Sequence, residues 1–188
     1  MRSSIVLATV LPAAFTYAIP AVVPWTSAKD NKVACNATET GYISFVTPGG
    51  PSNGTQLAVD SCKALDPCLY PEDLHPTGSP DDIVCPMTLD RSLNKAKSGS
   101  MHITALYGGN KRSKNITIDL FPPANPTGQE TYRKADCEGY LSQLFSLQKD
   151  KGGCADKTQD AHMGQLTVGT GSTLSGAVFK ASLIDSAT

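Results

Sequence analysis

The chain is poor in aromatic residues and lacks any sequence signature of a specific reaction. Aromatic residues make up 6% of its 188 residues, and Trp25 is the single tryptophan. Only three histidines are present, and no two of them have the spacing of metal ligands on a helix. Charges almost cancel at a formal net charge of −1, which provides no electrostatic basis for nucleic-acid binding. We therefore expect no metal, no cofactor and no nucleic-acid partner.

After the N-terminus, the chain has no apolar run long enough to cross a bilayer, so we predict no membrane insertion. The N-terminus itself begins with Arg2, continues as a mostly apolar stretch over residues 5–15 and reaches the small residue Ala18. This pattern is typical of a cleaved signal peptide over residues 1–18, and a cut after Ala28 also fits the small-residue rule. We expect a secreted, extracellular protein.

Cysteine is the most informative residue type in the chain. An oxidising destination favours disulfides over metal ligands or reactive thiols, and the spacing leaves the pairing open. The six cysteines are Cys35, Cys62, Cys68, Cys85, Cys137 and Cys154. Three sequons for N-linked glycosylation begin at Asn36, Asn53 and Asn115. We expect at least one of them to carry a glycan if the source is a eukaryote.

Hydrophobic patterning predicts an α+β fold. Period-two alternation and β-branched residues predict strands over 41–46, 56–59, 100–107, 115–121, 165–168 and 174–184. Apolar residues recur at helical spacing over 131–149, and Cys137 on that face should pair with a cysteine of the sheet. We predict an antiparallel sheet of about five to six strands with one main helix packed on a face, a disulfide-stabilised α/β sandwich.

Proline and charge divide the rest of the chain. Residues 19–34 are predicted to be a loose N-terminal arm, followed by a single domain over 35–188. Five prolines within 66–86 exclude a central strand or a long helix there. Acidic residues gather in 60–82 and basic residues in 91–114, so these segments pair with each other, form a basic patch or stay solvated. Lys111-Arg112, in a predicted exposed loop over 108–114, is a candidate site for a processing protease.

Two patterns suggest catalysis, and we interpret both as surface features. Gly50-Pro-Ser52-Asn-Gly54 has the spacing of a nucleophile elbow, with His162 downstream. We interpret it as a hairpin turn, because a short strand instead of a helix is expected to follow. Acidic side chains in the proline-rich loop have the chemistry of a carboxylate pair or a calcium site, but lack a recognisable spacing: Glu72, Asp73, Asp81 and Asp82.

The C-terminal third contains Cys137-x-x-Tyr140-Leu141 on the predicted helix, then Cys154, then Gly164-Gln-Leu-Thr and Ala177-Val-Phe-Lys. This order resembles a recurring tail of small secreted fungal proteins. Among them is the glycan-binding domain first known from inky-cap mushrooms, an α/β sandwich. Those tails place their second cysteine where this chain has Leu147. The resemblance implies a fungal, extracellular, non-catalytic protein.

We predict a secreted, non-catalytic protein that binds extracellular or cell-wall glycans. Exposed aromatic rings stack on sugar faces, so the candidate contacts are Tyr70 in the proline-rich loop and Tyr107 at a strand end. Trp25 is not among them because it lies in the predicted arm. One alternative is an effector or inhibitor that binds a host surface protein. Another is a small hydrolase that uses Ser52 or a carboxylate pair.

Overall fold

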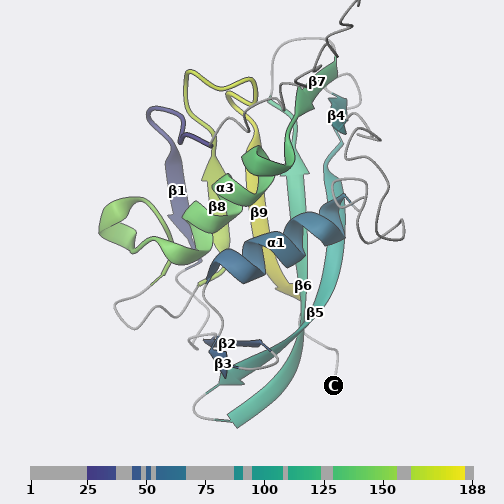
Figure 1. The fold of residues 1–188 in the computed structure, drawn as a ribbon, viewed down its shortest axis with the longest axis vertical. Coiled ribbons are helices and arrows are strands. Elements are labelled where there is room, and N and C mark those ends of the chain that lie inside the picture. Colours follow the sequence, from purple (N-terminus) through teal and green to yellow (C-terminus); the bar gives the residue numbers. More distant parts are fainter. Residues whose placement is uncertain are drawn as a thin grey trace, which may run out of the picture.

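A seven-stranded antiparallel sheet with two helices across one face forms the centre of the protein (Figure 1). The computed structural model describes residues 25–36, 44–47, 50–51, 54–66, 87–90, 95–107, 110–123, 129–155 and 162–184. Within them, the sheet has the order β1-β8-β9-β6-β5-β2-β3. Its strands are β1 (Lys32–Cys35), β2 (Ser44–Thr47), β3 (Gly50–Pro51), β5 (Lys97–Tyr107), β6 (Asn110–Phe121), β8 (Gly164–Thr167) and β9 (Val178–Ile184). A separate two-stranded ribbon pairs β4 (Met87–Asp90) with β7 (Gln129–Tyr132).

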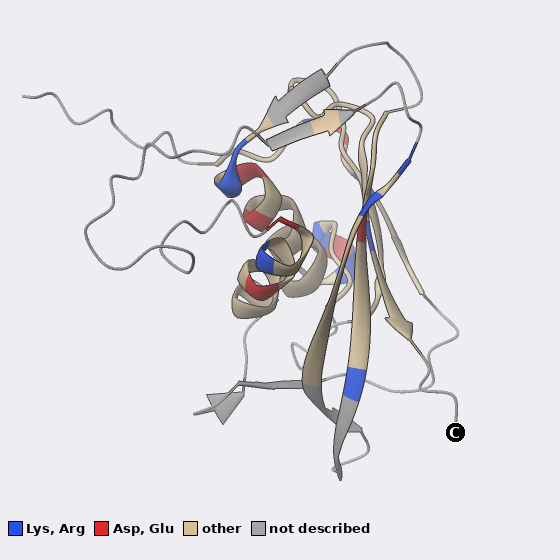
Figure 2. Ribbon diagram, turned by 90° about the vertical axis from the view of Figure 1, so that its right-hand side faces the viewer, with Lys and Arg blue, Asp and Glu red and all other residues tan. Residues whose placement is uncertain are grey.

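The predicted α+β class is confirmed, although the sheet has more strands than predicted and a second helix is present. The two helices, α1 (Gly54–Leu65) and α3 (Lys134–Ser146), lie side by side on the same face of the sheet (Figure 2). No described helix is long and apolar enough to cross a membrane.

The predicted pairing of the two alternating segments is confirmed as β5 and β6. Ile103, Ile116 and Ile118 are buried beneath the helices, and their neighbours in sequence face the other side. The loop predicted over 108–114 is wrong, because residues 110–114 continue β6 and pair with 103–107. Lys111-Arg112 therefore lies in a strand. Backbone hydrogen bonds form an antiparallel ladder, so polar side chains do not prevent it. The predicted C-terminal hairpin is confirmed as β8 and β9, but the second strand begins at Val178 instead of residue 174, because residues 173–176 form a turn.

Helix α1 replaces the strand that we predicted over 56–59. Its buried residues include Leu57, Ala58, Cys62 and Leu65, which recur at the spacing of one helix face. The dense run of turn residues before Gly54 suggested a hairpin and concealed this period. The prediction was wrong because a window of four residues, 56–59, is too short to distinguish the helical period from the strand period.

Helix α3 confirms the predicted amphipathic helix but is shorter at both ends. The backbone N–H of Arg133 donates to the Asp136 carboxylate at 3.0 Å, and the Arg133 guanidinium pairs with the same carboxylate. After Ser146 the chain becomes extended at Leu147 and forms a 3-10 turn, η2 (Lys149–Lys151). Gly152 ends that turn at φ 81°, a left-handed conformation that favours glycine.

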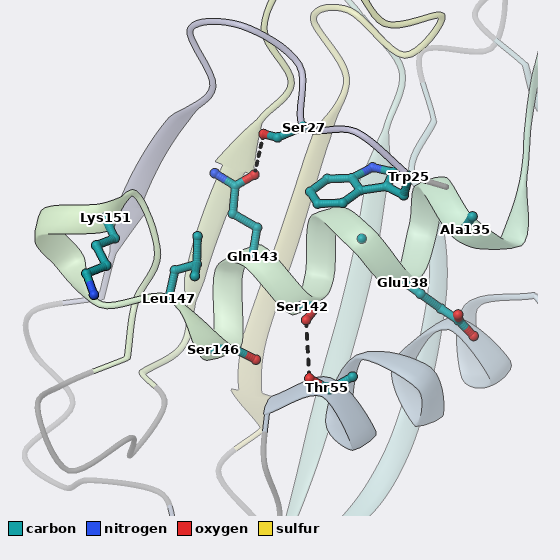
Figure 3. A pocket seen from close by; sticks show the side chains of 11 residues that line it. Trp25, Ser27, Thr55, Ala135, Glu138, Ser142, Gln143, Ser146, Leu147 and Lys151 are labelled. Atoms are coloured by element: carbon teal, nitrogen blue, oxygen red, sulfur yellow. Dashed lines mark hydrogen bonds between the residues drawn. The ribbon is translucent and has the colours of Figure 1, made fainter. Parts of the chain in front are cut away.

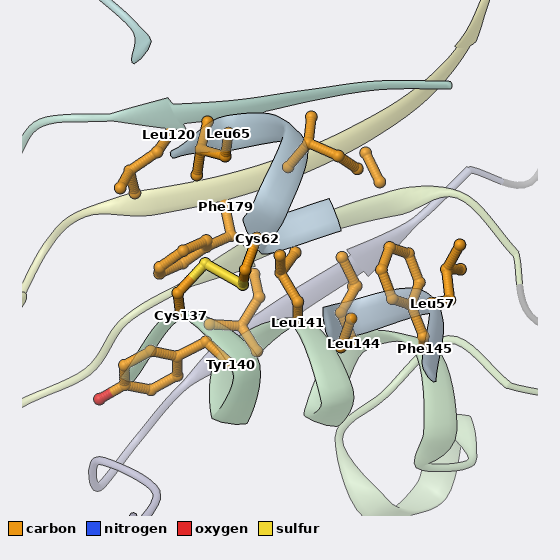
Figure 4. Close-up of a cluster of buried hydrophobic side chains, with 14 of the residues drawn as sticks. Leu57, Cys62, Leu65, Leu120, Cys137, Tyr140, Leu141, Leu144, Phe145 and Phe179 are labelled. Carbon is orange, nitrogen blue, oxygen red and sulfur yellow. A yellow bond between two sulfur atoms is a disulfide. The ribbon is translucent and has the colours of Figure 1, made fainter. Parts of the chain in front are cut away.

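Two disulfides hold the helical layer and the edge of the sheet. Cys62–Cys137 joins α1 to α3 inside the core (Figure 4), so the prediction that Cys137 pairs with the sheet was wrong. Cys35–Cys154 joins β1 to the segment after η2 across 119 residues of sequence. In the chain-entropy model, closing a loop of that length lowers the conformational entropy of the unfolded chain and thereby stabilises the folded protein by roughly 5 kcal/mol. Cys68 and Cys85 lie outside the described residues.

The N-terminal arm is part of the fold from residue 25 onward. β1 pairs with β8 along its whole length, and the backbone N–H of Lys29 donates to Thr170 at 3.0 Å. Trp25 packs against the hydrophobic core. The prediction of a loose arm is therefore wrong for residues 25–34, because pairing with β8 and the Cys35–Cys154 disulfide bind this segment to the domain.

Candidate functional site

The outer surface of α3 forms one side of an open groove of about 620 Å³ (Figure 3). The inner face of this helix is buried through Cys137, Tyr140, Leu141, Leu144 and Phe145. Small residues on the opposite side of α3 leave space above the helix. The groove is lined by Trp25, Ser27, Thr55, Ala135, Glu138, Gly139, Ser142, Gln143, Ser146, Leu147 and Lys151.

Trp25 forms one wall of the groove and is held tightly against α3. A Cβ atom at Gly139 would lie 2.2 Å from Cδ2 of the indole, so only glycine permits this approach. The ring also meets Tyr140 edge to face, with centroids 5.3 Å apart and planes at 89°. The indole N–H is buried without an acceptor among the described residues. Packing therefore sets the position of the ring, while Trp25 as a residue stays partly exposed at the groove.

The buried amide of Gln143 connects three segments around the groove. Its Oε1 accepts hydrogen bonds from Ser27 at 3.1 Å and from the Asn31 side chain at 2.9 Å. Its Nε2 donates to the carbonyl of Gly152 at 3.1 Å. Asn31 in turn accepts a bond from the N–H of Gly169 at 2.8 Å. Gln143 thus holds the Trp25 segment and the turn after α3 in fixed positions.

The opposite wall comes from the start of α1. The hydroxyls of Thr55 and Ser142 lie 3.5 Å apart and join the two helices at the surface. A Cβ atom at Gly54 would lie 2.7 Å from the backbone carbonyl carbon of Phe145, so α1 begins directly on the last turn of α3. Together with the Cys62–Cys137 disulfide, these contacts make the groove a feature of two rigid helices.

The polar groups of the groove are spread along its length. Glu138 and Lys151 lie toward opposite ends, and the hydroxyls of Ser142 and Thr55 lie between them (Figure 3). Of the residues that the structure describes, no histidine or cysteine lines it. Among the described residues, no three His, Cys, Asp or Glu side chains are grouped as a metal site. What the groove offers is an aromatic wall beside hydrogen-bonding groups.

The structure tests few of the predicted site residues. Tyr70 and the four acidic residues of the proline-rich loop lie outside the described residues, as do Ser52, Asn53 and His75. Tyr107 is the last residue of β5 and pairs with Asn110, but its side chain is not described. His102 is exposed on β5, and the backbone N–H of His162 donates to Cys154. The predicted contacts Tyr70 and Tyr107 therefore stay untested.

The helix that follows Gly50–Pro51 corrects our reason for rejecting a nucleophile elbow. A strand followed by a helix is the context that the elbow requires. However, β3 has two residues and lies at the edge of an antiparallel sheet, whereas the elbow follows a central strand of an α/β-hydrolase sheet. The interpretation as a turn now depends on this topology.

A second polar cluster lies at the end of α1. The amino group of Lys97 pairs with the buried carboxylate of Asp66, so the predicted acidic and basic segments meet at this point. The hydroxyl of Tyr132 is also buried and has no partner among the described residues. Burial, and then the charge of Asp66, raise the pKa of Tyr132. This cluster joins α1 to β5.

Trp25 is the residue that our sequence reasoning missed. A glycine inside a predicted helix lowers helix stability and usually has a packing reason. Gly139 was such a signal, since it occupies the middle of α3. It indicated that a bulky group lies on the helix at this position but not that the group was Trp25.

Comparisons with known proteins add no relative. No protein-family model, no curated protein and no solved structure matches the chain. The resemblance of the C-terminal third to secreted fungal proteins stays a prediction.

Proposed function

We propose that the protein acts outside the cell by binding glycans of a cell wall or a host surface, and that the groove on α3 is the binding site. The observation that carries this proposal is the partly exposed indole of Trp25, held in one position at the wall of an open groove. The disulfides and the predicted signal peptide support an oxidising, extracellular location.

A sugar ring is amphipathic, and so is the groove. The C–H face of a sugar stacks on an aromatic ring, while the hydroxyls at its edge require donors and acceptors. Trp25 and Leu147 provide apolar surface, and Glu138, Ser142 and Lys151 provide polar groups. The volume of about 620 Å³ lies within the range of small-ligand sites. Because the groove is open, it accommodates one segment of a longer chain.

The fixed position of the indole favours binding as well. An aromatic side chain that is already ordered loses little conformational entropy when a ligand binds. Gly139, Tyr140 and Gln143 provide this order before any ligand is present.

The experiment is a glycan and cell-wall polysaccharide array probed with the disulfide-intact protein secreted from a eukaryotic host. Binding that free sugar competes away supports the proposal. Trp25→Ala should weaken it by at least about tenfold, equivalent to about 1.4 kcal/mol. Phe121→Ala is the matched control, because Phe121 is also a partly exposed aromatic residue (37%) but lies on the other face of the sheet.

A second readout does not depend on a variant. Since Trp25 is the single tryptophan, a bound sugar should change the intrinsic fluorescence and protect the indole from oxidation by N-bromosuccinimide. Binding that leaves Trp25 reactive would place the glycan elsewhere. If no glycan binds to the folded protein, the proposal is wrong, and a host protein becomes the leading ligand.

A further inference from the structure

The sheet has a second face on which no described element packs (Figure 2). Alternate residues of its central strands point to this side, and those described are polar except at Phe121, Val178 and Ile184. Thr117 lies in register with Ser100 on β5 and Ser182 on β9, and Asp119 accepts a hydrogen bond from Ser98. We name this surface the outer face.

The sequon at Asn115 presents both of its recognition residues on the outer face. Ile116, between Asn115 and Thr117, is fully buried beneath the helices. Because side chains alternate along a strand, Asn115 and Thr117 point to the opposite side, and both are partly exposed. Asn115 lies in register with His102 on one neighbouring strand and with Ile184 on the other.

The sequon at Asn36 lies at the edge of the same face. Asn36 follows β1 and is exposed. It lines a small hollow of about 200 Å³ together with Gln165, Lys180 and Ser182. Ser182 is also in register with Thr117, so the two sequons share one surface. The groove on α3 lies on the other side of the sheet, and neither asparagine lines it.

We infer that N-linked glycans on Asn36 and Asn115 cover the outer face and leave the helical face accessible. Ile184 is 41% exposed directly beside Asn115, which places apolar surface where the first sugar of the glycan attaches. That sugar packs its C–H face on Ile184, and its polar groups meet His102 and the row of hydroxyls. The glycan thereby shields an exposed apolar side chain on a flat sheet face, a surface that otherwise favours association.

The first test is a map of glycan occupancy. The full chain is secreted from a eukaryotic host, treated with peptide N-glycosidase in heavy-oxygen water and analysed by mass spectrometry. We expect both Asn36 and Asn115 to be converted to labelled aspartate. An unmodified Asn115 in secreted, folded protein would overturn the inference.

The second test asks whether the Asn115 glycan lies on the face. Thr117→Ala removes the sequon, and Thr117→Ser is the matched control that keeps it. Diethyl pyrocarbonate should modify His102 several times faster in the alanine variant than in the serine variant. His162 provides the internal reference and should react equally in both. Equal His102 rates would show that the glycan points away from the face.

Enzymatic deglycosylation of the folded wild-type protein provides the same comparison if the alanine variant is not secreted. His102 should then become more reactive after the glycan is removed. These tests do not depend on the ligand of the groove, so they can succeed or fail independently of the proposed glycan binding.

Discussion

The contact between Trp25 and Gly139 predicts that one substitution will have opposite effects in two backgrounds. Gly139→Ala adds a methyl group that would lie 2.2 Å from the indole, so the ring must leave the helix. Alanine in place of glycine inside a helix is favourable by about 1 kcal/mol. Truncation of a large core aromatic costs about 3–5 kcal/mol. Since Trp25 is only partly buried, we assign its packing about 2 kcal/mol.

The two terms give a net destabilisation of about 1 kcal/mol for Gly139→Ala in the wild-type protein. In a Trp25→Ala background no indole is displaced, so the same substitution should stabilise by about 1 kcal/mol. Urea denaturation followed by far-ultraviolet circular dichroism measures all four corners of this double-mutant cycle. In the single variant Gly139→Ala, Trp25 fluorescence should also shift to the red and become more accessible to acrylamide. Equal stabilisation in both backgrounds would refute the reasoning.

Three further predictions follow from the other contacts. Gln143→Leu removes the acceptor of the Ser27 hydroxyl and of one Asn31 N–H, and it removes the donor to the Gly152 carbonyl, so it should cost about 3 kcal/mol. Hydrogen exchange should speed up over 27–31 and 149–152 but not in β6. Faster exchange in β6 would indicate a general loss of structure. Tyr132→Phe removes a buried hydroxyl that has no described partner, so it should be neutral or stabilising by up to about 1 kcal/mol at pH 7. In the wild-type protein the pKa of Tyr132 is raised, so above pH 10.0 the unfolded chain releases the phenolic proton while the folded protein keeps it. Wild-type stability should therefore fall with pH above 10.0, and less steeply in Tyr132→Phe, as urea titrations at several pH values would show. Finally, four cysteines are already paired, so Cys68 should pair with Cys85. A cross-linked peptide in the non-reduced digest would establish this, and alkylation of either thiol in the native protein would contradict it.

β5, β6 and α3 were largely predictable because their periods continue over many residues, whereas the short strands β1, β3, β4 and β7 were not predicted. β5 and β6 alternate for long enough to identify the buried side, and α3 repeats its apolar face over three turns. α1 has the same helical period in Leu57, Cys62 and Leu65, but turn residues precede it and residues 56–59 alone also fit a short strand. The sequence pattern therefore predicts a helix or strand only where its apolar repeat continues over several periods.

The candidate site was not predictable in this way because its contacts join distant parts of the chain. Trp25 meets Gly139, and Asn31 meets Gln143, across more than a hundred residues of sequence. Composition marked Trp25 only as the single tryptophan, and the prolines before it suggested a loose arm. Pairing of β1 with β8 overrides that local signal. No rule of sequence spacing indicates that β8 is the strand with which β1 pairs.

The small residues of α3 are not by themselves evidence for a ligand. Gly139 is explained by Trp25, Ser142 by its contact with Thr55, and Ser146 by the close approach of Gly54. Each has a packing reason within the protein, so a variant at these positions tests the fold before it tests binding. Trp25 is only partly buried and lines the groove. Substitution of this ring therefore separates a binding groove from a gap between packed segments.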